Sequence, residues 1–214
     1  MKGNIFFIFL VLILFTLMGV FIYKGVNINR VYDFKIYFFN AGKADCILIS
    51  CNSKYIMIDT GEAELSDEIL TYLRKNNIKK LDYLIITHFD KDHVGSASSI
   101  INNIEVENVL QSNSPKESAY YDSYISALAK KGITPKTITG DYKFTLGDLS
   151  IVVNGPDKTY ENNESNNSSL IVSTIYKNNK FLFMGDADNQ RIKDFVETIL
   201  KNMILSKFHI MGIT

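Results

Sequence analysis

The segment that most constrains the fold of this chain is Thr87–Gly95, which holds two histidines and two aspartates within six residues. It directly follows Leu81–Ile86, an apolar, β-branched run whose length predicts a buried strand. Side chains alternate along extended backbone, so the cluster divides between two sides. We expect His88, Asp90 and Asp92 on one side and His93 on the other. The cluster therefore predicts two adjacent metal positions at a sheet edge; a loop of merely solvated polar residues is the alternative.

The size and charge of the chain limit the classes of function. Its 214 residues suffice for one α/β domain but hardly for two. The 23 basic and 23 acidic residues balance, so no overall field attracts nucleic acid or an acidic membrane surface. Cys46 and Cys51 lie about 16 Å apart if the chain between them is extended, which is beyond disulfide reach. We expect both to be buried free thiols.

The N-terminal segment 5–23 is apolar and carries no charge. As a helix it would span about 28 Å, close to the hydrocarbon thickness of a bilayer. We predict a single-pass anchor at the cell membrane, with a tail over 1–4, a linker over 24–32 and the remaining domain, 33–214, outside the cell. A cleaved signal peptide, which would give a secreted form, is the alternative, although no Ala-x-Ala cleavage site follows.

The remaining chain alternates between strand and helix patterns, which predicts an α/β domain of two sheets packed face to face with helices outside. Strands are expected over 33–40, 45–50, 54–59, 81–86, 106–111, 142–146, 149–153, 169–176 and 180–184, and from Met203 onward. Helices are expected over 66–76 with Ser66 as a cap, over 96–102, over 118–131 with Tyr121, Ile125 and Leu128 inward, and over 187–201 with Ile192, Phe195, Val196 and Ile199 inward. Asp59, Asp92 and Asp186 each stand at or just past the end of an apolar strand, where a site would gather.

Five motifs in this order resemble the metallo-β-lactamase fold, an αββα sandwich, and more narrowly the hydrolase domain of ComEC-type competence proteins and their stand-alone relatives. They are Asn40–Asp45, Ile58–Gly61, His88–Gly95, Asn167–Leu170 and Gly185–Ala187. The third motif is specific, whereas the others gain their weight from the order in which they occur. The resemblance covers nearly all of the chain beyond the predicted anchor.

The resemblance implies a role for each matching residue. His88 and Asp90 would face one metal ion, Asp92 and His93 the second, and Asp186 would bridge the two. The broader superfamily has histidine at the position of Asp90, whereas the competence-type branch has aspartate there. Asp45 and Asp59 would hold the ligands in place, although an ordinary turn aspartate is the alternative for each; Lys43 is read as an exposed turn residue.

The implied activity is hydrolysis of phosphodiester or related ester bonds, with Asp92 and His93 in the catalytic centre. Two divalent ions about 3.5–4 Å apart would activate a bridging hydroxide and stabilise the developing negative charge. Zinc is expected from the imidazole ligands, and Asp90 leaves manganese as the alternative. The substrate would be a small molecule or a nucleic acid, and no protein partner can be inferred.

The last family motif is altered in this chain. Ile210 and Met211 occupy the positions where the resemblance places histidines, and His209 comes one or two residues early. A shifted reading frame past the codon of Lys207 permits Pro-His-His-Gly, so we expect a C-terminally incomplete domain. Two functions remain open: a metallohydrolase, and an impaired or inactive module that binds without turnover.

Overall fold

The structure is a computed structural model that describes residues 12–16, 18, 34–160 and 162–210. The chain divides into two compact units, residues 1–33 and 34–214. In the first unit the described residues are helical. The predicted tail 1–4 and linker 24–32 lie outside the described residues.

The predicted localisation as a single-pass membrane protein is contradicted. Across the described ranges, no helix combines the length and the apolar character that crossing a bilayer requires. The 22-residue helix α6 (Asn189–Ile210) is long enough but carries charged residues along its sequence. Most of the predicted anchor, 5–23, lies outside the described residues.

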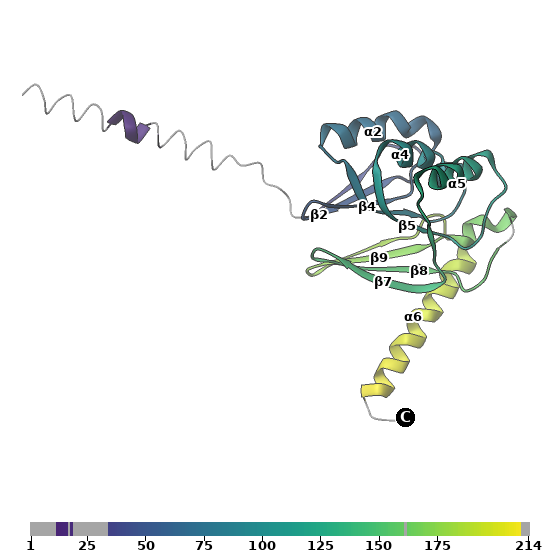
Figure 1. Cartoon of the computed structure of the whole chain (residues 1–214). Coiled ribbons are helices and arrows are strands. Elements are labelled where there is room, and N and C mark those ends of the chain that lie inside the picture. Colours follow the sequence, from purple (N-terminus) through teal and green to yellow (C-terminus); the bar gives the residue numbers. More distant parts are fainter. Residues whose placement is uncertain (1–11, 17, 19–33, 161, 211–214) are drawn as a thin grey trace, which may run out of the picture. The chain divides into compact units, whose positions relative to one another are not determined.

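Two β-sheets packed face to face form the second unit, as the sequence predicted (Figure 1). The first sheet has the order β1 (Phe34–Phe38), β2 (Ile47–Cys51), β3 (Lys54–Ile58), β4 (Lys80–Ile86), β5 (Glu105–Gln111) and β6 (Lys136–Thr137). The second has the order β10 (Asn179–Phe183), β9 (Ile171–Tyr176), β8 (Leu149–Gly155) and β7 (Gly140–Leu146). β3, β4, β5 and β6 run parallel, and the remaining pairs are antiparallel.

The alternation of side chains along the central strands produces two apolar cores. In β2, Ile47 and Ile49 join the core between the sheets, whereas Leu48 joins the core beneath the helices. In β4, Ile85 faces the second sheet while Leu84 faces the helices. These strands are buried on both faces, which is why they read as continuous apolar runs in the sequence. The buried free thiols Cys46 and Cys51 belong one to each core, which confirms their prediction.

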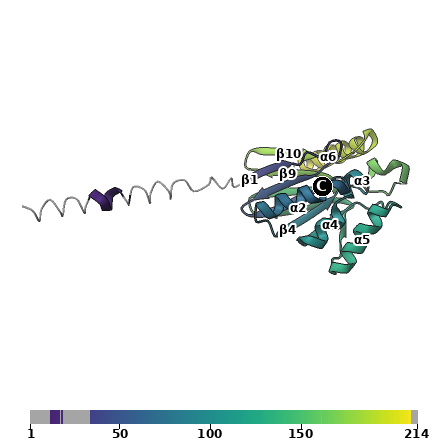
Figure 2. The ribbon, with the colours of Figure 1, turned by 90° about the horizontal axis from the view of Figure 1, so that it is seen from above.

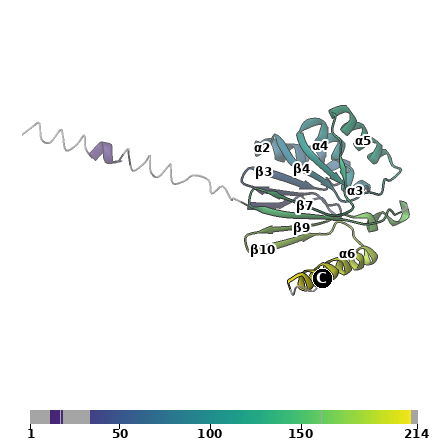
Figure 3. The same cartoon turned by 60° about the horizontal axis from the view of Figure 1, so that its bottom comes forward.

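The helices lie on the outer sides of the two sheets. The first sheet is covered by α2 (Ser66–Lys75), α4 (Ala97–Asn103) and α5 (Ala119–Lys131), which Figure 2 shows from above. Figure 3 shows α6 on the far side of the second sheet. The short helices α3 (Lys91–Val94), η1 (Ala63–Leu65) and η2 (Asn162–Ser168) lie in the connections.

Helix α5 ends as predicted, and of its predicted inner residues Tyr121 and Leu128 pack against the core, whereas Ile125 does not. Gly132 follows it in the left-handed conformation, with φ +67°, which ends the helix. The buried residues are Tyr124, Ala127 and Leu128, whereas Ile125 is exposed. The hydroxyl of Tyr124 donates a hydrogen bond to Gln111 at 2.8 Å, which secures this face of the helix against β5.

Two further local predictions are wrong. Ser66 does not cap α2, because η1 precedes it and its hydroxyl donates to the carbonyl oxygen of Ala63 instead. No strand begins at Met203, since α6 continues as a helix to Ile210. Extending a helix adds one hydrogen bond per residue, whereas a new strand needs a sheet edge beside it.

Helix α6 turns inward a different face from the predicted one, which comprised Ile192, Phe195, Val196 and Ile199. Phe195 is buried as expected, whereas Val196 and Ile199 are exposed. The buried position one turn before Phe195 is occupied by Arg191, a charged residue.

Candidate metal centre

The candidate site lies where the parallel strands β3 and β4 end. Carboxyl ends of parallel strands meet at one edge of a sheet, so Asp59 after β3 lies beside Thr87 and His88 after β4. The ligand segment leaves this edge and forms α3, so Asp92 and His93 are helical. The expected strand-like alternation of this segment is therefore wrong, although its residues still reach a common point.

Asp59 is the central support of the site and is fully buried. Its Oδ1 accepts a hydrogen bond from the backbone N–H of Thr87 at 2.7 Å, and its Oδ2 accepts one from the Thr87 hydroxyl at 2.6 Å. The same Oδ2 lies 2.9 Å from Nδ1 of His93. Asp59 adopts φ +53°, a conformation that aspartate and asparagine tolerate better than most residues. The predicted supporting role agrees with these contacts.

His93 is held at both its backbone and its ring. Its carbonyl oxygen accepts hydrogen bonds from the N–H of Thr60 at 2.7 Å and from the Thr60 hydroxyl at 2.9 Å. Its Nε2 lies 3.2 Å from Oδ1 of Asp186. Burial alone would lower the pKa of His93, but the carboxylates of Asp59 and Asp186 outweigh it and raise the pKa to about 11, so a metal ion that binds Nε2 must displace its proton.

The ring of His88 is buried next to that of His93, with 4.1 Å between their centroids. Its Nδ1 lies 3.2 Å from the hydroxyl oxygen of Thr87 and 3.4 Å from that of Ser169. Burial and the neighbouring His93 lower the pKa of His88, so this ring stays neutral. Its Nε2 is left facing away from these partners.

Three of the five predicted ligands converge. One ligand atom from each of His88, His93 and Asp186 lies within 4.8 Å of the other two. The Nε2 atoms of both histidines are buried; among the described residues that of His88 has no hydrogen-bond partner, and that of His93 has only the carboxylate of Asp186 at 3.2 Å. Buried ring nitrogens ordinarily find a hydrogen-bond partner, and metal coordination is one way to satisfy them. The donor set of two imidazoles and a carboxylate therefore fits a divalent metal ion.

Asp90 and Asp92 do not join this group. Oδ1 of Asp90 lies 3.9 Å from Nε2 of His88 but accepts a hydrogen bond from the ammonium of Lys116 at 2.6 Å. Asp92 is half-buried, and its carbonyl oxygen accepts a hydrogen bond from the N–H of Asp45 at 3.2 Å. The assignment of Asp90 to one metal ion with His88, and of Asp92 to a second with His93, stays a prediction.

Asp45 forms a second close group with Asp59 and His93. Burial and the neighbouring carboxylate of Asp59 raise the pKa of Asp45. Because Nδ1 of His93 is already bonded to Asp59, this group supports the ring rather than presenting a free ligand set. Its arrangement agrees with the predicted supporting role of Asp45.

Asp186 reaches the histidines because a glycine precedes it. Gly185 adopts φ +51°, and a Cβ atom there would lie 2.8 Å from the hydroxyl oxygen of Thr87. The second sheet is also joined to the first at this point, since the N–H of Leu170 donates to the carbonyl oxygen of Thr87 at 2.9 Å. The site therefore depends on close packing between the ends of the two sheets.

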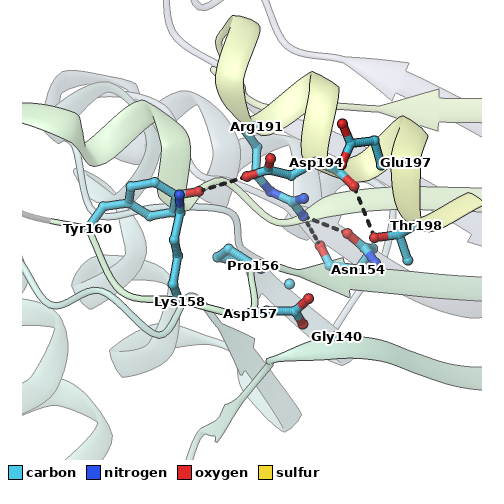
Figure 4. Close-up of a pocket in the computed structure, with 11 residues that line it drawn as sticks. Gly140, Asn154, Pro156, Asp157, Lys158, Tyr160, Arg191, Asp194, Glu197 and Thr198 are labelled. Atoms are coloured by element: carbon cyan, nitrogen blue, oxygen red, sulfur yellow. Dashed lines mark hydrogen bonds between the residues drawn. The ribbon is translucent and has the colours of Figure 1, made fainter.

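Arg191 is a supporting residue that the sequence did not identify. Its guanidinium is 2% exposed and donates to the carbonyl oxygen of Ser169 at 2.9 Å, and to the carbonyl and side-chain oxygens of Asn154 at 2.7 Å each. Figure 4 shows it turned toward Asn154, beside a cavity of about 260 Å³. Arg191 thus links α6 to Ser169, whose hydroxyl oxygen lies 3.4 Å from Nδ1 of His88. Lysine or arginine on a helix ordinarily indicates a solvated face, so no sequence signal marked this position.

Comparisons with known proteins agree with this geometry. The family model of the metallo-beta-lactamase superfamily matches residues 40–211. ComE operon protein 3 of Bacillus subtilis (strain 168) is 23% identical over 122 residues, which are 57% of this chain and 16% of that protein. The chain thus spans less than a fifth of the length of this relative.

Two solved structures are reported as similar to this chain at low identity. A HARLDQ-motif mutant metallo-beta-lactamase from Cronobacter sakazakii has a TM-score of 0.50 and 10% identity, over 69% of this chain and 60% of that one. The metallo-beta-lactamase fold protein YhfI from Bacillus subtilis has a TM-score of 0.46 and 14% identity, over 69% of this chain and 57% of that one. The family match extends from the turn after β1 through α6 and includes every proposed ligand. The chain belongs to the metallo-beta-lactamase superfamily.

Proposed function

We propose that this chain is a metal-dependent hydrolase of phosphodiester or related ester bonds, with a divalent ion held by His88, His93 and Asp186. The observation that carries the proposal is the convergence of two buried ring nitrogens beside one carboxylate, with Nε2 of His88 lacking a hydrogen-bond partner among the described residues. Membership of a superfamily of metal-dependent hydrolase fold supports the reaction class. The competence-type motifs, whose resemblance implies phosphodiester hydrolysis, support the choice of phosphodiester.

Zinc is the ion that we propose, because imidazole nitrogen and carboxylate oxygen are its usual ligands outside thiolate sites. Manganese is the alternative, since Asp90 replaces a histidine of the broader superfamily with a harder oxygen ligand. When bound, such an ion polarises the substrate and lowers the pKa of a coordinated water to about 7. Three protein ligands leave a coordination position open, which is typical of catalytic rather than structural sites.

Some residues of the site orient the histidine rings, and others determine from which side the substrate approaches. Asp59 fixes the ring of His93, while Thr87 and Ser169 flank Nδ1 of His88, so both rings present Nε2 to the ion. The side chain of Asp186 is 41% exposed, whereas both histidines are fully buried. We therefore expect the substrate to approach from the side of Asp186. Asp92 and His93 keep their predicted place in the catalytic centre within this proposal.

Hydrolysis of bis-p-nitrophenyl phosphate tests the proposal. The metal-free full-length chain is reconstituted with zinc or manganese, and release of p-nitrophenolate is followed. Asp186→Asn is expected to reduce the rate by about 100-fold or more, because losing a ligand costs at least as much as losing its supporting residue. Asp92→Ala tests the predicted role of Asp92, which lies outside the three converging ligands: loss of cleavage would support that role, and an unchanged rate would contradict it.

Asp188→Asn is the matched control for Asp186→Asn. Asp188 is exposed two residues further on, and its Oδ1 accepts a hydrogen bond from the N–H of Gln190, which asparagine can also accept. This variant should keep the wild-type rate. Metal binding without turnover under either ion would overturn the hydrolase and favour a binding module, the function that the altered last motif raises.

A further inference from the structure

A lysine occupies the position next to the candidate centre where a second metal ion was predicted. Lys116 lies between β5 and α5, and its ammonium donates to Oδ1 of Asp90 at 2.6 Å and to the hydroxyl oxygen of Ser165 at 3.4 Å. The side chains of Lys116 and Asp90 are 26% and 24% exposed. This ion pair is therefore largely shielded from water and holds three separate connections of the chain together.

The carboxylate of Asp90 is already paired with a cation, the ammonium of Lys116. The ammonium of Lys116 lies 2.6 Å from Oδ1 of Asp90 and balances the charge of this carboxylate at contact distance. Charge-assisted hydrogen bonds of this length are among the stronger ones in proteins.

Asp90 approaches the converging ligands only at His88. Its Oδ1 lies 3.9 Å from Nε2 of His88, a separation that one metal ion can bridge, but in the described part of the chain Asp90 belongs to no group of three convergent ligand atoms. A metal ion bound to Oδ1 would have to displace the ammonium or lie beside it. Two cations on one carboxylate oxygen repel each other, and the repulsion is strong where water is largely excluded.

We propose that Lys116 takes the place of the second metal ion, so that the centre binds a single divalent ion through His88, His93 and Asp186. The ammonium supplies a fixed positive charge at Asp90 and excludes a second ion from that carboxylate. This inference rests on the proposed metal site. It replaces the expectation of two ions with one ion and one built-in cation.

Metal stoichiometry tests the inference independently of activity. The full-length chain is stripped of metal, equilibrated with zinc, passed through a desalting column and analysed by inductively coupled plasma mass spectrometry. The wild type should retain one equivalent. Lys116→Met keeps the length of the side chain but removes its charge, so it should retain two equivalents.

Two further variants locate the ions. Lys116→Arg keeps a cation beside Asp90 and should retain one equivalent, like the wild type. The double variant Lys116→Met/Asp90→Asn removes the carboxylate that the second ion needs and should return to one equivalent. Circular dichroism of each variant verifies that the fold is intact.

The outcomes separate this inference from the proposed function. Two equivalents in the wild type, or one equivalent in a folded Lys116→Met variant, would overturn the role of Lys116 while leaving the proposed metal site in place. No retained metal in the wild type would overturn the metal site itself. If Lys116→Met does not fold, the wild-type stoichiometry still decides between one ion and two.

Discussion

Oδ2 of Asp59 lies 2.9 Å from Nδ1 of His93, and both side chains are fully buried. A carboxylate only accepts hydrogen bonds, so the ring donates at Nδ1 and its Nε2 is the atom left to bind a metal ion. Asp59 is itself fixed by two hydrogen bonds from Thr87. The tautomer of His93 is thus set by the end of β3, a different strand from the one that precedes the ligand segment.

Replacing Asp59 with asparagine should weaken metal binding without unfolding the protein. Asparagine tolerates φ +53° and still accepts the N–H of Thr87, but an amide nitrogen in place of Oδ2 donates toward Nδ1 of His93. The ring must then carry its proton on Nε2. We expect zinc affinity to fall about 10–100-fold, measured by competition with a chromophoric chelator. Asp148→Asn, an exposed acid bonded to Asn52, is the control and should bind zinc like the wild type.

Arg191→Met should destabilise the whole domain. The substitution leaves the carbonyl oxygens of Ser169 and Asn154 and the side-chain oxygen of Asn154 without their donor in a buried position. We expect the free energy of unfolding to fall by about 3 kcal/mol or more, measured by urea denaturation. Lys193→Met changes an exposed residue of the same helix and should stay within about 0.5 kcal/mol of the wild type. Equal losses in the two variants would refute the structural role of Arg191.

Gly185→Ala should impair both stability and metal binding. The new Cβ atom would lie 2.8 Å from the hydroxyl oxygen of Thr87, which is already bonded to Asp59 and cannot easily move away. Gly147→Ala is the matched control, since φ is +58° there but the nearest contact of a Cβ atom is 3.4 Å. Both variants should lose about 1–2 kcal/mol from left-handed strain, measured by thermal unfolding. Only Gly185→Ala should also bind zinc more weakly, because it displaces Asp186; unchanged zinc affinity would contradict this packing.

Asp82 should make stability depend on pH in the acid range. Burial would raise its pKa, but the N–H of Tyr55 and the ammonium groups of Lys54 and Lys80 outweigh burial and lower it from the ordinary 3.8. A carboxyl with a lower pKa in the folded state stabilises the protein above its unfolded pKa and loses this contribution as the pH falls through the folded pKa.

The comparison of wild type with Asp82→Asn isolates this contribution. The difference in unfolding free energy should be about 1.5–3 kcal/mol near pH 6 and shrink as the pH falls below about 4. Glu105→Gln, an exposed acid on β5, should show no such difference. A constant difference from pH 6 to pH 2.5 would show that ionisation of Asp82 contributes nothing to the fold.

The sequence was sufficient for the sheets because their signals are local. The turn Asn52–Ser53, with positive φ at both residues, joins β2 and β3 as predicted. The alternation around Gly147 likewise produces the β7–β8 hairpin. Such patterns depend on adjacent residues and not on contacts between distant segments.

The missed features depend on contacts between distant segments. Lys116 meets Asp90, which lies 26 positions earlier, and Arg191 meets Asn154, which lies 37 positions earlier. Nothing in the neighbouring residues of either cation distinguishes it from a solvated surface charge. The helical conformation of the ligand segment was not predicted either, because four residues are too few for a periodic signal.

The most direct test of the account is a crystal structure of the full-length chain grown with zinc, with an anomalous difference map calculated at the zinc absorption edge. The account predicts one strong peak about 2.0–2.1 Å from Nε2 of both His88 and His93 and about 2.0–2.2 Å from a carboxylate oxygen of Asp186. A map without a peak at these three residues, or with its strongest peak at other side chains, would contradict the account.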